Sequence, residues 1–267
     1  MTPSEHALVK KDLIEIWNSK MARATLIAVP VLLVIVLPSL FLAMVRLVPM
    51  EQAEGVGKML TLLPESAAGY NLQQGIYHIL TNLLFPLFYL IIPLTASAVS
   101  ASCIFVGEKE RSTIETLLLT PLRVRQIFRA KLSCCMFLSF LCSAISFAVL
   151  TIVVSVGDIM LGLPFFVNWE WLAIILLLAP GLAVFGVLFM VFSFNRSSNR
   201  LESFQMVAYA ALPLILLYIG QFAGFFRVDA LGLTGFSIAF WLLDLVLWFI
   251  DRKTFLPEKF LYQPPEG

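Results

Sequence analysis

The side chains most able to do chemistry in this chain are the charged ones of residues 107–132. This segment carries six basic and three acidic residues and lies between two long apolar stretches. The rest of the chain has no Ser/His/Asp set, no paired carboxylates and no phosphate cradle that would support catalysis. The string nearest to a phosphate-binding loop, residues 55–59, lacks the glycine spacing and the hydroxyl that such a loop needs. We therefore expect the chain not to be an enzyme.

Composition places the chain in the membrane class. Of its 267 residues, 60% are hydrophobic and 13% charged, whereas a soluble domain is about half apolar and a quarter charged. The net charge of +1 gives no field that would attract nucleic acid. The two histidines and four cysteines have no zinc-type spacing, so we expect no metal or cofactor in this chain and reduced thiols at Cys103, Cys134, Cys135 and Cys142.

Six apolar segments are each long enough to cross a bilayer core, which takes roughly 20 helical residues. They are residues 24–48, 76–105, 132–156, 171–194, 205–226 and 231–250. The second is long enough to tilt, break or protrude, and Pro86 and Pro93 favour a break. The predicted fold is an all-α membrane protein with six transmembrane helices, forming a single transmembrane domain over residues 1–267.

Lysine and arginine residues predict the orientation of the spans. Fifteen of the 18 lie before span one, between spans two and three, between spans four and five, or after span six; Arg46, Lys58 and Arg227 are the exceptions. The positive-inside rule then places both termini and the tail, residues 251–267, in the cytoplasm. We expect a multi-pass protein of the cell membrane. On the outer side, Trp169 and Trp171 are predicted to anchor the interface.

Residues 1–23 are predicted to form an amphipathic helix that lies in the inner membrane interface. Val9, Leu13, Ile16 and Trp17 fall on one face at helical spacing, and polar residues fall on the other. Lysines with a tryptophan on the apolar side are typical of interfacial helices. A solvated lead-in to span one is the alternative.

The charged segment also has the signals of a short helix. Ser112 and Glu115 match a capping box, which predicts a helix start at Ser112. Ile114, Leu117 and Leu118 then share one face, and a proline three residues after Leu118 ends the helix. An apolar face on a capped cytoplasmic helix suits a groove on a partner protein. Packing on the protein's own helices or on lipid headgroups is the alternative.

Residues 107–122, GEKERSTIETLLLTPL, resemble the signature G-E-(K/R)-E-R-(G)-T-(L/I)-E-x-L-L-x-(T/S)-P-(L/V) of ABC-2 type transporter permeases, which lies between spans two and three. Ser112 departs from it where glycine is frequent, and residues 123–125 depart where a Ser-Arg pair commonly follows. The resemblance implies a membrane subunit that pairs with a second six-span permease, identical or paralogous. It also implies a cytoplasmic ABC ATPase, two copies per complex, which binds ATP and magnesium.

In such permeases the segment between spans two and three, here residues 107–131, contains the coupling helix that docks the ATPase. By this resemblance the coupling residues are Glu108, Glu110, Arg111, Thr113, Ile114, Glu115, Leu117, Leu118 and Pro121. The three aliphatic side chains would fill a groove on the ATPase, and the first three charged ones would form ion pairs at its rim. The proline would set the angle at which the chain enters span three.

Polar residues inside spans are costly and often functional. The resemblance places spans two and five near the translocation path, and the candidates there are Tyr77, Asn82, Tyr89, Gln205, Tyr209, Tyr218 and Gln221. Ordinary hydrogen bonding within or between helices is the alternative for each. Asp244 is the one acid inside span six. It either pairs with an arginine or lysine near the inner boundary or couples a proton or cation.

The leading functional hypothesis is an exporter permease with spans one and two in residues 24–106 and spans three to six in residues 132–250. It would couple ATP hydrolysis by a partner to outward movement of a drug, peptide, ion or lipid-type substrate. A non-transporting sensor or regulatory subunit partnered with the same kind of ATPase is a second hypothesis. An ion-driven secondary transporter is a third.

Overall fold

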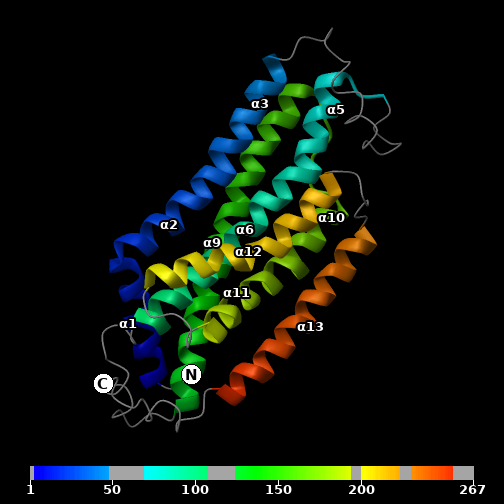
Figure 1. Ribbon diagram of the computed structural model, residues 1–267. Coiled ribbons are helices and arrows are strands. Elements are labelled where there is room, and N and C mark those ends of the chain that lie inside the picture. The colour runs from blue at the N-terminus through cyan, green and yellow to red at the C-terminus, as the bar shows by residue number, and fades with distance from the viewer. Residues whose placement is uncertain (1–2, 48–68, 108–123, 194–199, 223–229, 255–267) are drawn as a thin grey trace.

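The structure is a computed structural model that describes residues 3–47, 69–107, 124–193, 200–222 and 230–254. Every regular element in these residues is helical, as predicted. The α-helices are α1 (Pro3–Asn18), α2 (Lys20–Pro30), α3 (Leu37–Leu47), α5 (Leu72–Ile79), α6 (Phe85–Ala101), α9 (Val124–Leu161), α10 (Trp169–Ala173), α11 (Ala179–Ser193), α12 (Arg200–Phe222) and α13 (Ala230–Thr254). They form one elongated bundle (Figure 1).

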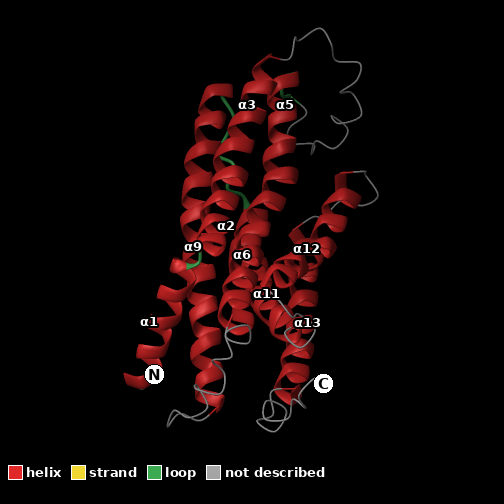
Figure 2. Cartoon of the chain, turned by 60° about the vertical axis from the view of Figure 1, so that its left-hand side comes forward, coloured by secondary structure: helices red, strands yellow, loops and turns green. Residues whose placement is uncertain are grey.

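The two ends of the bundle hold different parts of the chain. α1 and the last turns of α13 lie at one end, which we call the basal end, and α3 and α5 reach the opposite, distal end (Figures 1 and 2). This arrangement brings the described beginning and end of the chain to the same side.

Five helical stretches in the described part are long and apolar enough to cross a membrane: Lys20–Leu47, Leu72–Val106, Gln126–Leu161, Trp169–Ser193 and Gly232–Ile250. They coincide with predicted spans one to four and span six. Predicted span five falls on α12, which is helical for 23 residues, but its apolar part, Ala211–Gly220, is shorter. The count of six spans and the orientation of the termini stay predictions.

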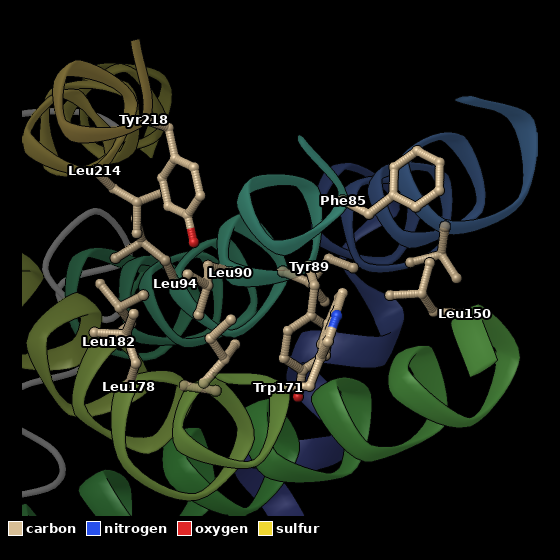
Figure 3. Packing of buried hydrophobic residues seen from close by; sticks show 14 of the residues in the cluster. Phe85, Tyr89, Leu90, Leu94, Leu150, Trp171, Leu178, Leu182, Leu214 and Tyr218 are labelled. Carbon is tan, nitrogen blue, oxygen red and sulfur yellow. The ribbon is translucent and has the colours of Figure 1, made fainter. Parts of the chain in front are cut away.

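The core of the bundle lies around α6. This helix packs against α9, α11, α12 and α2, and nearly all of its side chains are buried. Figure 3 shows Leu90 and Leu94 of α6 between Leu182 of α11 and Leu214 of α12. The outer helices expose many large apolar side chains, which cost little where the surroundings are lipid tails.

Prolines explain most of the irregular turns in the spans. Four π-helical turns join the α-helices: Val31–Val36, Leu80–Leu84, Ser102–Val106 and Ile174–Leu178. Three of them end two residues before a proline, at Pro38, Pro86 and Pro180. Proline lacks an N–H and its ring crowds the carbonyl four residues earlier, so a wider turn relieves the clash. The break predicted in span two is therefore a π turn inside a continuous helix.

Predicted span three and the residues that precede it form one unbroken helix, α9. It has 38 residues, or about 57 Å at 1.5 Å per residue, against a hydrocarbon core of about 30 Å. Its ends must therefore extend beyond the core. The first turns of α9 lie at the basal end, beside α1 (Figure 2).

The turn between α9 and α10 has defined stop and start signals. Gly162 has φ of 67°. The N–H groups of Gly162 and Leu163 donate to the carbonyls of Ile159 and Asp158 at 3.4 and 2.8 Å, as in a Schellman motif. The backbone then reaches Asn168, whose side chain accepts a hydrogen bond from the Trp171 N–H at 3.1 Å and caps α10.

Candidate functional site

The predicted coupling residues lie outside the described residues, because residues 108–123 are not described. This applies to Glu108, Glu110, Arg111, Thr113, Ile114, Glu115, Leu117, Leu118 and Pro121. The structure does describe both ends of this segment. The π turn Ser102–Val106 precedes the segment, and α9 begins directly after it, at Val124.

The two ends of the segment meet at the basal end of the bundle. The rings of Phe105 and Phe128 have centroids 5.9 Å apart, and Phe105 is buried. The Nζ atom of Lys131 lies 5.9 Å from the centroid of the Phe105 ring, within cation–π range. The segment between them therefore begins and ends at neighbouring points.

A buried ion pair joins α1 to the same place. Lys131 Nζ lies 3.8 Å from Asp12 Oδ2, and the two side chains are only 3% and 1% exposed. Two charges at this burial carry a large desolvation cost, so their mutual attraction matters for where each helix packs. Neither residue was singled out as a site from the sequence. The sequence spacing points to Asp12, because this residue stands four positions from both Leu8 and Ile16 and therefore shares their face of the helix.

Apolar contacts on either side of the ion pair also hold α1 against the bundle. Leu8 packs with Ile127 and Ala130 of α9. Ile16 is 1% exposed and belongs to a buried cluster that also includes Cys103 and Cys134.

Trp17 does not lie on the packed face of α1. Its side chain is 56% exposed, whereas Val9 and Leu13 are partly buried. The face of α1 that packs on the protein is therefore centred on Leu8, Asp12 and Ile16, and Trp17 lies outside it. The interfacial position of α1 stays a prediction.

Two of the span-two candidates for a translocation path, Tyr77 and Tyr89, pack against α9. The phenol of Tyr77 donates to the Val154 carbonyl at 3.2 Å. The Tyr89 hydroxyl lies 2.8 Å from Ser143 Oγ. Both tyrosines are 1% exposed, and both partners are on α9. Hydrogen bonding between helices, the alternative considered above, accounts for these two side chains.

Asn82 is bonded at both ends of its amide. Its Nδ2 donates to the His78 carbonyl at 3.0 Å, and its Oδ1 accepts from Asn168 Nδ2 at 3.0 Å. The second bond ties span two to the turn before α10. Nearby, Gln74 Nε2 donates to the Leu161 carbonyl at 2.8 Å. Hydrogen bonds from Gln74 and Asn82 thus connect the chain between α9 and α10 to span two.

The span-five candidates on α12 lie on different faces. Gln205 is exposed and Tyr209 is 61% exposed. Tyr218 is buried, and its side chain points towards Leu90 and Leu94 of α6 (Figure 3). The side chain of Gln221 lies outside the described residues. The structure therefore does not gather the six path candidates whose side chains it describes in one place within a single chain.

Trp171 corrects the prediction of two interface anchors. Trp169 is 71% exposed, as an anchor would be, but Trp171 is 1% exposed. Its ring lies among Tyr89, Phe147 and Phe166, with centroids 5.2 to 6.2 Å away. Burial follows from the cap at Asn168, because a helix that starts there turns Trp171 towards the core.

Asp244 is buried in the contact between α13 and α11. Its side chain is 3% exposed, and neither carboxylate oxygen has a hydrogen-bond partner among the described residues. α11 offers no charged residue along Ala179–Ser193. One turn before it, the indole N–H of Trp241 donates to the Leu177 carbonyl at 3.1 Å. Pairing with an arginine or lysine of the described part is not seen.

No metal centre is formed by the described residues, in which no three His, Cys, Asp or Glu side chains are grouped to hold an ion. The four cysteines are free thiols. At the basal end, Phe105 and Phe128, which flank residues 108–123, lie in contact, and the ion pair between Asp12 and Lys131 joins α1 to α9 beside them.

Comparison with known proteins gives one match. The family model described as "ABC-2 family transporter protein" matches residues 6–236, which is most of the chain. No curated protein and no solved structure matches.

Proposed function

Because the chain belongs to the ABC-2 transporter family, we propose that it is the permease subunit of an ATP-driven exporter and that residues 108–121 dock a separate ATP-binding subunit. The family is one of transporter membrane proteins, and the described part has five helices able to cross a membrane. The match over residues 6–236 is the observation that carries the proposal.

The surroundings of residues 108–121 support a docking role. Phe105 and Phe128, which flank the segment on its two sides, lie in contact at the basal end. A docking element fixed at both ends can pass a displacement into both flanking helices, here α6 and α9. Ile114, Leu117 and Leu118 would enter the ATPase groove, with Glu108, Glu110 and Arg111 at its rim.

A second permease would complete the transport path. The exposed face of α12 carries Gln205 and Tyr209, followed by the apolar residues Leu212, Leu216 and Ile219. Polar side chains on the outside of a membrane helix are costly towards lipid. We place the partner permease, identical or paralogous, against this face. The path would then run between two chains, because Tyr77 and Tyr89 are engaged within one.

The direction and the cargo follow from the same family hypothesis. Transport would be outward across the cell membrane, with both termini in the cytoplasm as the lysine and arginine distribution predicts. The substrate would be a drug, peptide, ion or lipid-type molecule. ATP and magnesium would be bound by two copies of the partner ATPase.

Co-purification with the ABC ATPase encoded beside the chain tests the proposal. Wild type should retain the ATPase, and Leu118→Glu should lose it, because a carboxylate would be buried in an apolar groove. Thr116→Glu is the matched control, since it adds the same charge to the same segment away from the apolar stripe. ATP-dependent substrate flux in liposomes then distinguishes an exporter from a signalling subunit.

Two outcomes would count against the proposal. Equal retention by wild type and Leu118→Glu would move the contact to α1 or to the tail. Failure of wild type to bind any ABC ATPase would sink the exporter hypothesis and favour an ion-driven transporter.

A further inference from the structure

The outward face of α1 is both apolar and basic. α1 lies at the edge of the bundle, packed on α9 (Figure 2). On the side away from α9, Ile14 and Trp17 are spaced three residues apart, and their side chains are 52% and 56% exposed. Lys10, which is also exposed, lies two turns before Trp17 and therefore on the same side of the helix.

The exposed charges of α1 and α2 are all positive among the side chains that the structure describes. They belong to Lys10, Lys11, Lys20 and Arg23. Lys11 is engaged with Glu15, at 4.0 Å. The other three make no ion pair within the described part of the chain, so their ammonium and guanidinium groups can meet an anion from outside it.

The two acids of α1 whose side chains are described do not offset this surface charge. Asp12 is buried against Lys131, and Glu15 is only 12% exposed. The packing of α1 thus places its acids on the inner side and its uncompensated bases on the outer side. Contact with water alone would explain the bases, but it would not explain why Ile14 and Trp17 are exposed beside them.

The position of Trp17 along the chain places this face at a membrane boundary. The first stretch able to cross a membrane begins three residues later, at Lys20. Exposed apolar side chains continue from Trp17 to Met21 and Ile27 of α2, where the surroundings of a span are lipid tails. Tryptophan is also enriched at the level of the lipid headgroups. This continuity favours lipid over a protein as the neighbour of the face.

We propose that Lys10, Lys20 and Arg23, arranged around Trp17, form a binding surface for the headgroups of anionic phospholipids. Ile14 and Trp17 enter the boundary between headgroups and acyl chains, and the three cations bind the negative groups of the lipid. Each lysine or arginine near an anionic membrane surface favours binding by about fivefold. This inference goes beyond the proposed function and does not depend on the docking of an ATPase.

Quenching of Trp17 fluorescence by brominated lipids tests this surface in the full chain. The protein is reconstituted into vesicles of phosphatidylcholine and phosphatidylglycerol in which one lipid or the other carries bromine. The contribution of Trp17 is the signal that Trp17→Phe removes. Both brominated lipids should quench it. The enrichment of phosphatidylglycerol around Trp17, derived from the two quenching curves, should be about fivefold or more and should weaken as salt is added.

A charge-neutral variant assigns the preference to these residues. In the combined variant Lys10→Gln, Lys20→Gln and Arg23→Gln, quenching of Trp17 should persist, while the enrichment of phosphatidylglycerol should fall to about one. Arg46→Gln is the control, because it removes an exposed cation of α3 at the distal end, and it should leave the enrichment unchanged. All four side chains are exposed, so the melting temperatures should stay close to that of wild type.

Trp169 is a reference within the same protein. Its side chain is exposed, and the charged residue next to it is an acid, Glu170. Its signal, isolated with Trp169→Phe, should show no enrichment of phosphatidylglycerol. An equal enrichment around Trp17 and Trp169 would overturn the proposal, because the preference would then belong to the vesicles and not to this surface.

Three further results would overturn the proposal. If neither lipid quenches Trp17, the face meets water or protein. If the two lipids quench it equally, the face enters the membrane without recognising charge. If the enrichment persists in the combined variant, other residues create it. None of these results affects the docking proposal, which co-purification tests separately.

Discussion

Tyr77 of α5 fits into a space that Gly157 of α9 leaves open. The phenol donates to the Val154 carbonyl at 3.2 Å, and a Cβ atom at position 157 would overlap the phenol oxygen and the ring carbon that bears it. The glycine thus allows a buried tyrosine to reach the α9 backbone. This contact fixes the rotation of α5 against α9 at the distal end.

The first prediction follows from that fit. Gly157→Ala should lower the free energy of unfolding by about 1–3 kcal/mol, because overfilling a packed contact forces side chains or backbone to shift. Gly235→Ala in α13 is the control: an added Cβ there meets nothing within 4 Å, and alanine favours a helix by up to about 1 kcal/mol. Thermal unfolding in detergent measures both. Equal effects would contradict the packing argument.

A second prediction concerns a close contact between α6 and α11. A Cβ at Gly186 would overlap Ser97 Oγ and lie 2.8 Å from the Leu94 carbonyl oxygen. Gly186→Ala should therefore destabilise the protein by about 1–3 kcal/mol. Adding Ser97→Ala should restore part of the loss, because it removes the hydroxyl but not the carbonyl. The same melting assay in a double-mutant cycle would expose additive effects, which would refute direct contact.

The third prediction separates the two bonds made by Asn168. Asn168→Ala should cost about 0.5–2 kcal/mol for the lost helix cap and a further 0.5–1.5 kcal/mol or so for the bond to Asn82. Asn168→Asp keeps an acceptor for the Trp171 N–H and should recover most of the loss. Asn82→Ala, as a comparison, keeps the cap but removes the bond to Asn168 together with the bond from Asn82 Nδ2 to the His78 carbonyl. Thermal unfolding in detergent measures the variants, and a loss in Asn168→Asp as large as that in Asn168→Ala would contradict the capping argument.

The fourth prediction concerns Asp244. A buried polar group without a hydrogen bond costs about 1–3 kcal/mol in proteins, so Asp244→Leu should raise the free energy of unfolding by a similar amount. Ser237→Ala is the control on the same buried face, because its hydroxyl already donates to the Leu233 carbonyl at 2.8 Å, and it should bring no gain. A lower melting temperature for Asp244→Leu would mean that the carboxylate is partnered in the assembled complex. Stability gained together with flux lost would support a coupling role.

The sequence alone was sufficient for the class of the protein and the position of most spans. Long apolar runs are read along the chain, and a bilayer core demands them whatever the tertiary structure, so five predicted spans coincide with membrane-length helices. The match of residues 107–122 to a family signature is likewise local, and it agrees with the family whose model matches residues 6–236.

Only the tertiary structure decided what the polar residues inside those helices do. The contacts of Tyr77, Tyr89 and Trp171 depend on how each helix is rotated about its axis and which neighbour it meets, and hydropathy carries no such information. The same holds for Asp12 and Lys131, which lie 119 positions apart and become partners only when α1 packs on α9. Length and apolar content determined that these helices form, and packing between them determined which charges are paired and which tyrosines are enclosed.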